Sequence, residues 1–391
     1  MATTPSTIEN AGVVIIGSGL AGYTLAREFR KLDKETPLTI LSRDHAGFYS
    51  KPMLSNALAS NKTAATLVMK PAEKMAAELN AVVRSEVQVE RIDIEVKSIL
   101  LKGGEAIPYR DVVLALGADT LQIGLAGDGA NTVLSVNDLD DYARFAQQLD
   151  GVKFVVILGA GLIGCEFAND LLHRGIHSTV IDLADRPLSR LLPAEASAFM
   201  RQKLEAAGVQ FRFNVAVHGV NKTPTGFDVE LTDSSHIQAD MVLSAIGLRP
   251  RTELAAAADI AVNRGVIVNR HLVTSNAHVH ALGDCAEVAG HVLPYVMPLM
   301  QQARALAATL AGTPTHVVYP AMPVMVKTPA CPTVVCSPAP HAVGAWQVTT
   351  TADGCDARFM GVDNSLLGFA LLGAATAQKQ ALAAQVTGWL V

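Results

Sequence analysis

The 391-residue sequence has few cysteines and no long apolar run, and these absences exclude several classes of protein. Its five cysteines lie at irregular spacings and therefore do not form a disulfide framework. Every apolar run is shorter than the ~18 residues of a membrane span, and the longest, near 366–377, is interrupted by Gly368 and Gly373. The segment before Val13 has neither a basic start nor an apolar core, so we expect no secretory signal. These absences favour a cytoplasmic protein.

Charge is also sparse. Only 17% of the residues are charged, and the net charge of −5 comes without any basic tract, which argues against nucleic-acid binding. The eleven histidines form no cluster with the spacing of metal ligands, so we expect no metal site. Half of the residues are apolar, a composition that suits parallel sheets buried on both faces. The length allows two or three domains, each with its own core.

Two glycine-rich stretches carry the strongest functional signal. Residues 13–22 read VVIIGSGLAG, and residues 155–164 repeat the pattern as VVILGAGLIG. Each predicts a buried strand followed by G-x-G-x-x-G at the start of a helix. The first glycine permits the bend, the second lets backbone approach a pyrophosphate, and the third lets helix and strand pack closely. One fingerprint is weak evidence, but two predict two dinucleotides with electron transfer between them.

Signals outside the two fingerprints indicate how the chain divides into domains. After the second one, a strand at 178–181 ends in Asp182, where an acidic residue is expected to bind the adenine ribose. Apolar strands at 111–117 and 241–250 run into or through a glycine and mark two crossings between domains. We therefore predict an α/β fold of two Rossmann-like three-layer domains, one inserted in the other, plus a small α+β cap. The expected ranges are 1–117 with 248–316, then 118–247, and 317–391.

Taken together, these motifs resemble the two-dinucleotide flavoprotein reductases of the glutathione-reductase fold. The resemblance covers nearly the whole chain, including a Gly-Asp pair at 283–284 before a helix. In that family the first site holds FAD and the second NAD(P)H. The stretches YSKPMLSNAL, GDCAEV, LPYVMPLMQQARALA and MPVMVKTPACP are similar to the branch of alkane-degrading bacteria that reduces rubredoxin. This implies hydride transfer from NADH to FAD, then single electrons to rubredoxin, which feeds an alkane hydroxylase system.

The resemblance also implies the site residues. The first fingerprint would hold the FAD pyrophosphate, the backbone of Val89 the adenine, and Asp284 the ribityl chain. The residues implied for FAD are Gly17, Gly19, Leu20, Ala21, Gly22, Ser42, Arg43, Lys51, Val89, Gly117, Glu166, Asp284, Val296 and Lys327. The residues for NAD are Gly159, Gly161, Gly164, Asp182 and Gly247. Many relatives have a ribose-binding glutamate where this chain has Ser42, so either Asp44 or the backbone of Ser42 and Arg43 serves instead.

Lys51 and Glu166 are the expected catalytic residues. A Lys51–Glu166 pair beside the reacting edge of the flavin would stabilise its reduced form while keeping both charges partnered. Pro52 would place Lys51 at a helix entrance. The simpler interpretations are a solvated lysine and a carboxylate favoured by the helix dipole. Asp182 and Asp284 have a similar alternative as turn residues, and Lys327 as an edge-strand lysine.

The cysteines discriminate between branches of the family. Disulfide reductases of this fold carry a C-x4-C pair after the second strand of the FAD domain, but residues 38–58 contain no cysteine. Cys331 and Cys336 have that spacing in the cap, among prolines, where we expect them to pack as small apolar residues. Direct transfer from flavin to a one-electron carrier is therefore favoured. The alternatives are a [2Fe–2S] ferredoxin or flavorubredoxin as acceptor, and a flavoprotein that senses NADH.

An acidic carrier such as rubredoxin needs a local positive patch, because the whole molecule is negative. Lys51 and Lys327 are expected to tune the flavin instead. We therefore predict that Arg304 and Lys379 contribute to the docking surface.

Overall fold

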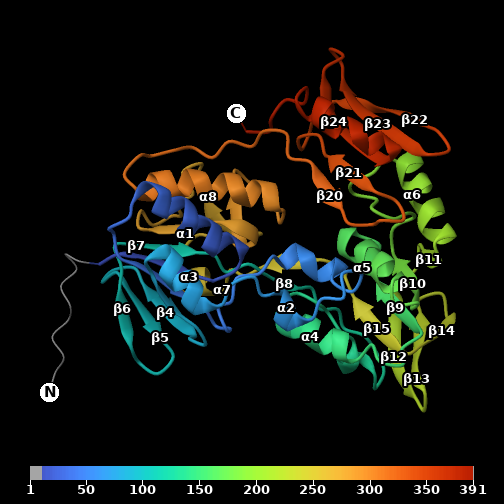
Figure 1. Ribbon diagram of the computed structural model, residues 1–391, viewed down its shortest axis with the longest axis horizontal. Coiled ribbons are helices and arrows are strands. Elements are labelled where there is room, and N and C mark those ends of the chain that lie inside the picture. The colour runs from blue at the N-terminus through green and yellow to red at the C-terminus, as the bar shows by residue number, and fades with distance from the viewer. Residues whose placement is uncertain (1–10, 391) are drawn as a thin grey trace.

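The computed structural model describes residues 11–390, so most of the segment before Val13 lies outside the described residues (Figure 1). Within the described range, no helix is long and apolar enough to cross a membrane. Figure 1 shows two parallel sheets, each with its own helices, and a third sheet formed by the end of the chain. This is the α/β architecture that the sequence predicts.

The first parallel sheet is built from both ends of the chain. Its strand order is β18-β7-β1-β2-β3, and all four pairings are parallel. The strands are β1 (Val13–Ile16), β2 (Leu38–Leu41), β3 (Val82–Arg84), β7 (Asp111–Leu114) and β18 (Val279–Ala281). β1 is buried at every position, as a strand covered on both faces must be.

Helices cover one side of this sheet, and a small antiparallel sheet lies on the other (Figure 1). Helices α1 and α8 pack against each other, and together with the smaller sheet they give three layers. The helices are α1 (Leu20–Leu32), α2 (Ala64–Leu67), α3 (Ala72–Leu79), α7 (Glu253–Ala256) and α8 (Val296–Leu310). The further strands are β4 (Val89–Asp93), β5 (Ser98–Leu101), β6 (Ala106–Pro108), β17 (Val266–Val268) and β19 (Ala286–Val288). Short 3-10 helices are η2 (Lys51–Asn56) and η4 (Gly283–Cys285).

The second parallel sheet lies between the two halves of the first in sequence. Its order is β11-β10-β9-β15, again parallel throughout. The strands are β9 (Phe154–Leu158), β10 (His177–Asp182), β11 (Val209–Phe213) and β15 (Met241–Ser244), and the antiparallel sheet beside them is β12 (Val217–Thr223), β13 (Gly226–Leu231) and β14 (His236–Ala239). The helices are η3 (Ala130–Thr132), α4 (Leu139–Gln147), α5 (Leu162–Leu172) and α6 (Ala194–Ala206).

The two crossings between the sheets pair with each other. β8 (Ala118–Thr120) and β16 (Leu248–Pro250) form a two-stranded antiparallel ribbon in which Ala118 is opposite Pro250. The sequence predicts one strand over 241–250 and one over 111–117, and both predictions are too long. The chain leaves β15 at Ser244 and passes through Gly247, whose φ of +124° breaks the strand before β16 begins.

The end of the chain forms an antiparallel five-stranded sheet with the order β20-β21-β24-β23-β22. Its strands are β20 (Val324–Val326), β21 (Thr333–Cys336), β22 (Gly344–Thr350), β23 (Gly354–Gly361) and β24 (Leu366–Gly373), followed by η5 (Ala374–Gln378) and α9 (Lys379–Ala383). The apolar run near 366–377 is thus a buried central strand. The final helix, α9, is only five residues long.

Candidate functional site

The first fingerprint forms a tight turn between β1 and α1. A Cβ atom on Gly17, where φ is +118°, would lie 2.2 Å from the carbonyl oxygen of Ala115, and one on Gly22 would lie 1.9 Å from that of Gly17. Gly19 differs, because its Cβ would meet no described atom within 4 Å. No described side chain caps α1 at this residue. The turn therefore offers open space in front of uncapped helix N–H groups, which fits a pyrophosphate.

The second fingerprint repeats this geometry between β9 and α5. A Cβ atom on Gly164 would lie 1.9 Å from the Gly159 carbonyl oxygen, so helix and strand are in close contact there as well. The Cβ of Gly161 would again face space free of described atoms, and α5 starts without a side-chain cap among the described residues. Both turns thus have the shape that a dinucleotide phosphate requires.

The strand that follows each fingerprint ends in a polar contact to the turn. Asp182, at the end of β10, accepts hydrogen bonds from the backbone N–H groups of Ala160 (2.6 Å) and Ala184 (2.8 Å). In the first domain the Ser42 hydroxyl lies 2.6 Å from that of Ser18 and donates to the Asp44 carboxylate at 2.6 Å. Asp44 therefore contacts the first fingerprint through Ser42 and also directly, by accepting from the Ser18 hydroxyl at 3.4 Å.

The Gly-Asp pair lies against the first fingerprint. A Cβ atom on Gly283 would come within 2.8 Å of the Ala21 side chain at the start of α1. The buried Gln302 of α8 holds this turn by accepting from the Gly283 N–H at 2.7 Å and donating to the Tyr319 hydroxyl at 2.7 Å. The residue before Asp284 therefore lies against the start of α1, and the contact of Asp284 with the ribityl chain stays a prediction.

Lys51 approaches the same region from η2. Its Nζ atom donates to Oδ1 of Asn137 at 2.6 Å. Burial lowers the pKa of Lys51, and the nearby Asp284 carboxylate opposes this effect. Burial likewise raises the pKa of Asp284, and Lys51 and Arg251 oppose it. Two segments more than 200 residues apart therefore bring opposite charges into one poorly hydrated region.

Glu166 has a different partner from the one predicted. Its carboxylate accepts from the Nζ atom of Lys327 at 2.6 Å, from the Lys327 backbone N–H at 2.9 Å, and from the Ser55 hydroxyl at 2.5 Å. The predicted Lys51–Glu166 pair is wrong, because Lys327 occupies the position opposite Glu166. Glu166 is fully buried, and a buried carboxylate needs such a complete set of donors. The Lys327 side chain remains 23% exposed.

Helix α5 joins three parts of the molecule through one row of polar residues. Besides Glu166, its buried Asp170 accepts from the backbone N–H groups of Leu58 (3.0 Å) and Ala59 (2.9 Å) after η2. Asn169 accepts from the Ala330 N–H at 3.0 Å in the loop after β20. The segment with Lys51 and the loop with Lys327 are therefore both fixed to the helix that the second fingerprint opens.

Sequence reasoning missed several of these partners. Ser55, Asn137, Asn169 and Asp170 were not identified, although Asn169 and Asp170 follow the second fingerprint closely in the stretch GCEFAND at 164–170. Arg251 was missed too. It donates to the Leu116 carbonyl at 2.8 Å and to Asp119 at 2.7 Å, and it lies 3.7 Å from where a Gly117 Cβ would be. It therefore links the two crossings beside Gly117.

The remaining predicted residues lie at the edges of these turns. Arg43 is exposed after Ser42, Val89 begins β4, and Val296 begins α8 with 40% of its surface exposed. Gly247 faces the Leu121 side chain. The contacts of these residues to a dinucleotide stay predictions.

The cysteines and possible metal ligands add no further chemistry. All five cysteines are free and buried, including Cys331 and Cys336. Burial raises the pKa of the Cys331 thiol to about 11, so it is protonated at neutral pH. Among residues 11–390, no group of three or more His, Cys, Asp or Glu side chains is arranged to hold a metal ion.

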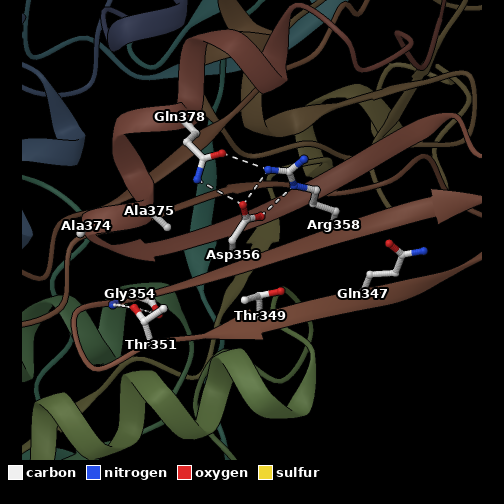
Figure 2. A pocket seen from close by; sticks show the side chains of 9 residues that line it. All are labelled: Gln347, Thr349, Thr351, Gly354, Asp356, Arg358, Ala374, Ala375 and Gln378. Carbon is white, nitrogen blue, oxygen red and sulfur yellow. Dashed lines mark hydrogen bonds and ion pairs between the residues drawn. The ribbon is translucent and has the colours of Figure 1, made fainter.

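The C-terminal sheet carries a polar hollow of about 570 Å³ on β22 and β23 (Figure 2). Its charged members, Asp356 and Arg358, bind each other through two hydrogen bonds of 3.0 and 2.8 Å, and Gln378 bonds to both. Residues 316–386 contain three basic residues and three acidic ones. Since Arg358 is neutralised within the hollow, this face is not a basic surface.

The chain matches two family models. Residues 11–307 match the pyridine nucleotide-disulphide oxidoreductase model, and residues 316–386 match the rubredoxin binding C-terminal domain. The chain therefore belongs to the pyridine nucleotide-disulphide oxidoreductase family.

Among individual relatives, it is 50% identical to the rubredoxin-NAD(+) reductase of Alcanivorax borkumensis, over 95% of this chain and 97% of that one. It is 49% identical to the enzyme of the same name from Acinetobacter baylyi, over 95% and 96%. A ferredoxin reductase for the CYP199A2 system of Rhodopseudomonas palustris superposes with a TM-score of 0.87 at 25% identity, over 97% and 96%.

Proposed function

We propose that the protein is an FAD-dependent NADH:rubredoxin oxidoreductase that acts in the cytoplasm and supplies electrons to an alkane hydroxylase system. The observation that carries this proposal is the position of the charged residues. The Gly283–Asp284 pair lies against the first open turn, Asp284 acts electrostatically on Lys51, and the Glu166–Lys327 ion pair lies on the helix opened by the second turn. The similarity to rubredoxin-NAD(+) reductases over nearly the full length supports the choice of acceptor.

Each part of the site has a role in this scheme. When bound, FAD accepts a hydride from NADH and passes electrons on singly. The turn at Gly17, Gly19 and Gly22 binds the FAD pyrophosphate through helix N–H groups, and Asp284 accepts hydrogen bonds from the ribityl hydroxyls. Lys51 supplies positive charge to the flavin ring. Burial lowers the pKa of Lys51, and the Asp284 charge opposes this shift.

The second half of the site orients NADH. The turn at Gly159, Gly161 and Gly164 binds its pyrophosphate, and Asp182 favours a ribose 2′-hydroxyl over a negatively charged 2′-phosphate. Glu166, held by Ser55 and Lys327, would present its end of α5 to the nicotinamide that the second turn delivers. We assign residues 1–117 and 248–316 to the FAD domain, 118–247 to the NAD domain and 317–391 to the cap.

Purification and rapid kinetics test this proposal. We expect a yellow protein with one non-covalent FAD per chain, which NADH reduces faster than NADPH does. NADH-dependent reduction of cytochrome c should require added rubredoxin. The rubredoxin-dependent rate should also fall with added salt, while flavin reduction by NADH barely changes, because docking of an acidic carrier is steered by exposed charges such as Arg304 and Lys379. Equal responses of both rates to salt would contradict the docking model.

A second acceptor follows from the structural neighbour. Because a ferredoxin reductase superposes over nearly the whole chain, a [2Fe–2S] ferredoxin is the alternative carrier. Parallel assays with equal concentrations of rubredoxin and ferredoxin decide between them. Higher kcat/KM for ferredoxin would reject rubredoxin as the acceptor, and turnover with neither would favour an NADH sensor.

A further inference from the structure

Lys51 has an unusual partner for a half-buried lysine. Its Nζ atom bonds to the side-chain carbonyl of Asn137, which is 8% exposed and comes from the segment between β8 and α4. Asp284 acts on Lys51 through space, without forming an ion pair within 4 Å among the described residues. The ammonium is therefore oriented by a neutral hydrogen-bond acceptor and not by a carboxylate in direct contact.

Asn137 is itself held rigidly. Its Nδ2 atom donates to the Ala118 carbonyl at 2.9 Å, so it is fixed to the crossing strand β8. Its backbone N–H donates to the Asp141 carboxylate at 2.9 Å in the first turn of α4. With the amide plane fixed by Ala118, Oδ1 has one direction available for Lys51. An aspartate at this position would fit the space, but it would cancel the lysine charge and repel the Ala118 carbonyl.

We propose that Asn137 is a positioning residue that aims the Lys51 ammonium at the flavin site while leaving its charge unneutralised. This inference rests on the proposed function, because it assumes that FAD binds beside Lys51. It also assigns a task in the FAD site to a residue of the inserted domain. The charge of Lys51 would favour the negatively charged reduced form of a bound flavin, so Asn137 would affect the flavin potential through Lys51.

A double-mutant cycle tests this directly. The variants of the cycle are Asn137→Ala, Lys51→Met and the double variant. A second comparison adds a negative charge beside Lys51 with Asn137→Asp, and adds the same charge at a control position with Asn269→Asp. Asn269 is exposed and its Oδ1 accepts backbone hydrogen bonds that an aspartate would keep. The readouts are the flavin midpoint potential, the affinity of the apoprotein for FAD, and the thermal unfolding midpoint.

We expect Asn137→Ala to lower the equilibrium constant for flavin reduction about tenfold, which is about 30 mV for a two-electron couple. The same substitution should have no effect on the potential when Lys51 is already methionine. Asn137→Asp should lower the potential at least as much, whereas Asn269→Asp should not change it. Loss of the Ala118 bond should lower the unfolding midpoint in both backgrounds, which separates the structural role from the electrostatic one.

Two results would overturn the inference. One is an unchanged potential in Asn137→Ala, and the other is an equal shift with and without Lys51. If Lys51→Met keeps the wild-type potential in a yellow, NADH-reducible enzyme, the inference fails while the proposed function stands. A wild-type protein that binds no FAD would instead refute both.

Discussion

The two fingerprint turns use the same backbone and different side chains. In both, a Cβ on the third glycine would lie 1.9 Å from the first glycine's carbonyl, and the middle glycine faces open space. In the second turn, Asp182 binds the residue between the glycines directly. In the first turn that residue is Ser18, whose hydroxyl contacts the Ser42 hydroxyl at 2.6 Å and donates to the Asp44 carboxylate at a longer distance of 3.4 Å. The turns therefore share the backbone geometry proposed to bind phosphate, and they differ in the side chains proposed to select the ribose.

The difference extends to the charged residues behind each turn. Behind the second, Glu166 is satisfied by a lysine, a hydroxyl and a backbone N–H. Behind the first, Lys51 has a neutral amide partner and a carboxylate that acts through space. A bound cofactor at the first turn therefore experiences charge that is oriented but not cancelled. At the second turn the charge is paired within the protein.

The largest expected effects come from substituting the third glycine of each turn, because each substitution should affect only one cofactor. Gly22→Ala and Gly164→Ala each force a Cβ into a carbonyl oxygen, so each should distort its own turn. We expect Gly22→Ala to lose FAD, and Gly164→Ala to keep FAD while flavin reduction by NADH slows roughly 100-fold, as expected for an ångström-scale displacement. Flavin content per chain and stopped-flow reduction measure the two effects.

Gly161→Ala is the matched control for Gly164→Ala. Its Cβ meets no described protein atom, so the unfolding midpoint should stay at the wild-type value while the added methyl group obstructs the dinucleotide. A Gly161→Ala protein that is reduced by NADH at the wild-type rate would show that no phosphate binds against this glycine.

The next effect concerns ribose selection. Asp182→Ala should reduce the preference for NADH over NADPH roughly tenfold. The substitution removes the repulsion between the carboxylate and a 2′-phosphate, and a loss of ~1.4 kcal/mol corresponds to a factor of ten. Asp44→Ala should weaken FAD binding and leave the ratio of kcat/KM for the two nicotinamide cofactors unchanged. Steady-state kinetics with both cofactors, and FAD titration of the apoproteins, test the pair. A wild-type enzyme without cofactor preference would contradict the role of Asp182.

The fold was predictable because its signals are local. Four consecutive apolar residues before each fingerprint predict a buried strand, and the structure has β1 and β9 there. The antiparallel sheet of β12, β13 and β14 was missed because its strands have mixed polarity and half-buried positions. The strands at the crossings were predicted too long, since periodicity does not reveal where a glycine with positive φ ends a strand.

The site was predictable only in part. Residues within a motif could be placed, such as Asp182 and the fingerprint glycines. The partner of Glu166 could not, because Lys51 and Lys327 are both lysines before a proline or threonine, and only the packing of three segments around α5 chooses between them. Asn137 has no pattern around it that distinguishes it from any loop asparagine. Its role depends entirely on tertiary contacts.

The smallest expected effect concerns an aspartate far from the fingerprint turns. Each parallel sheet has one at the edge where β7 or β15 begins. Asp240, before β15, accepts from the backbone N–H groups of Lys153 and Phe154. Asp111, which begins β7, instead contacts ionisable side chains, with His278 at 3.2 Å, His280 at 3.7 Å and Arg110 at 2.7 Å. Although burial alone would raise the pKa of Asp111, hydrogen bonds from these three residues outweigh it and hold that pKa below its usual value.

A lowered pKa in the folded state means that Asp111 stabilises the protein above its unfolded pKa of ~3.9, and that this contribution disappears as the pH falls further. We therefore expect Asp111→Asn to cost about 2 kcal/mol of unfolding free energy at pH 6–7. The difference from the wild type should shrink steadily below pH ~4. Denaturant titrations of the two proteins over this pH range measure it, with Asp150→Asn, an exposed aspartate near the second sheet, as the control. A difference between Asp111→Asn and wild type that stays constant with pH would show that the carboxylate contributes packing or neutral hydrogen bonds instead of charge.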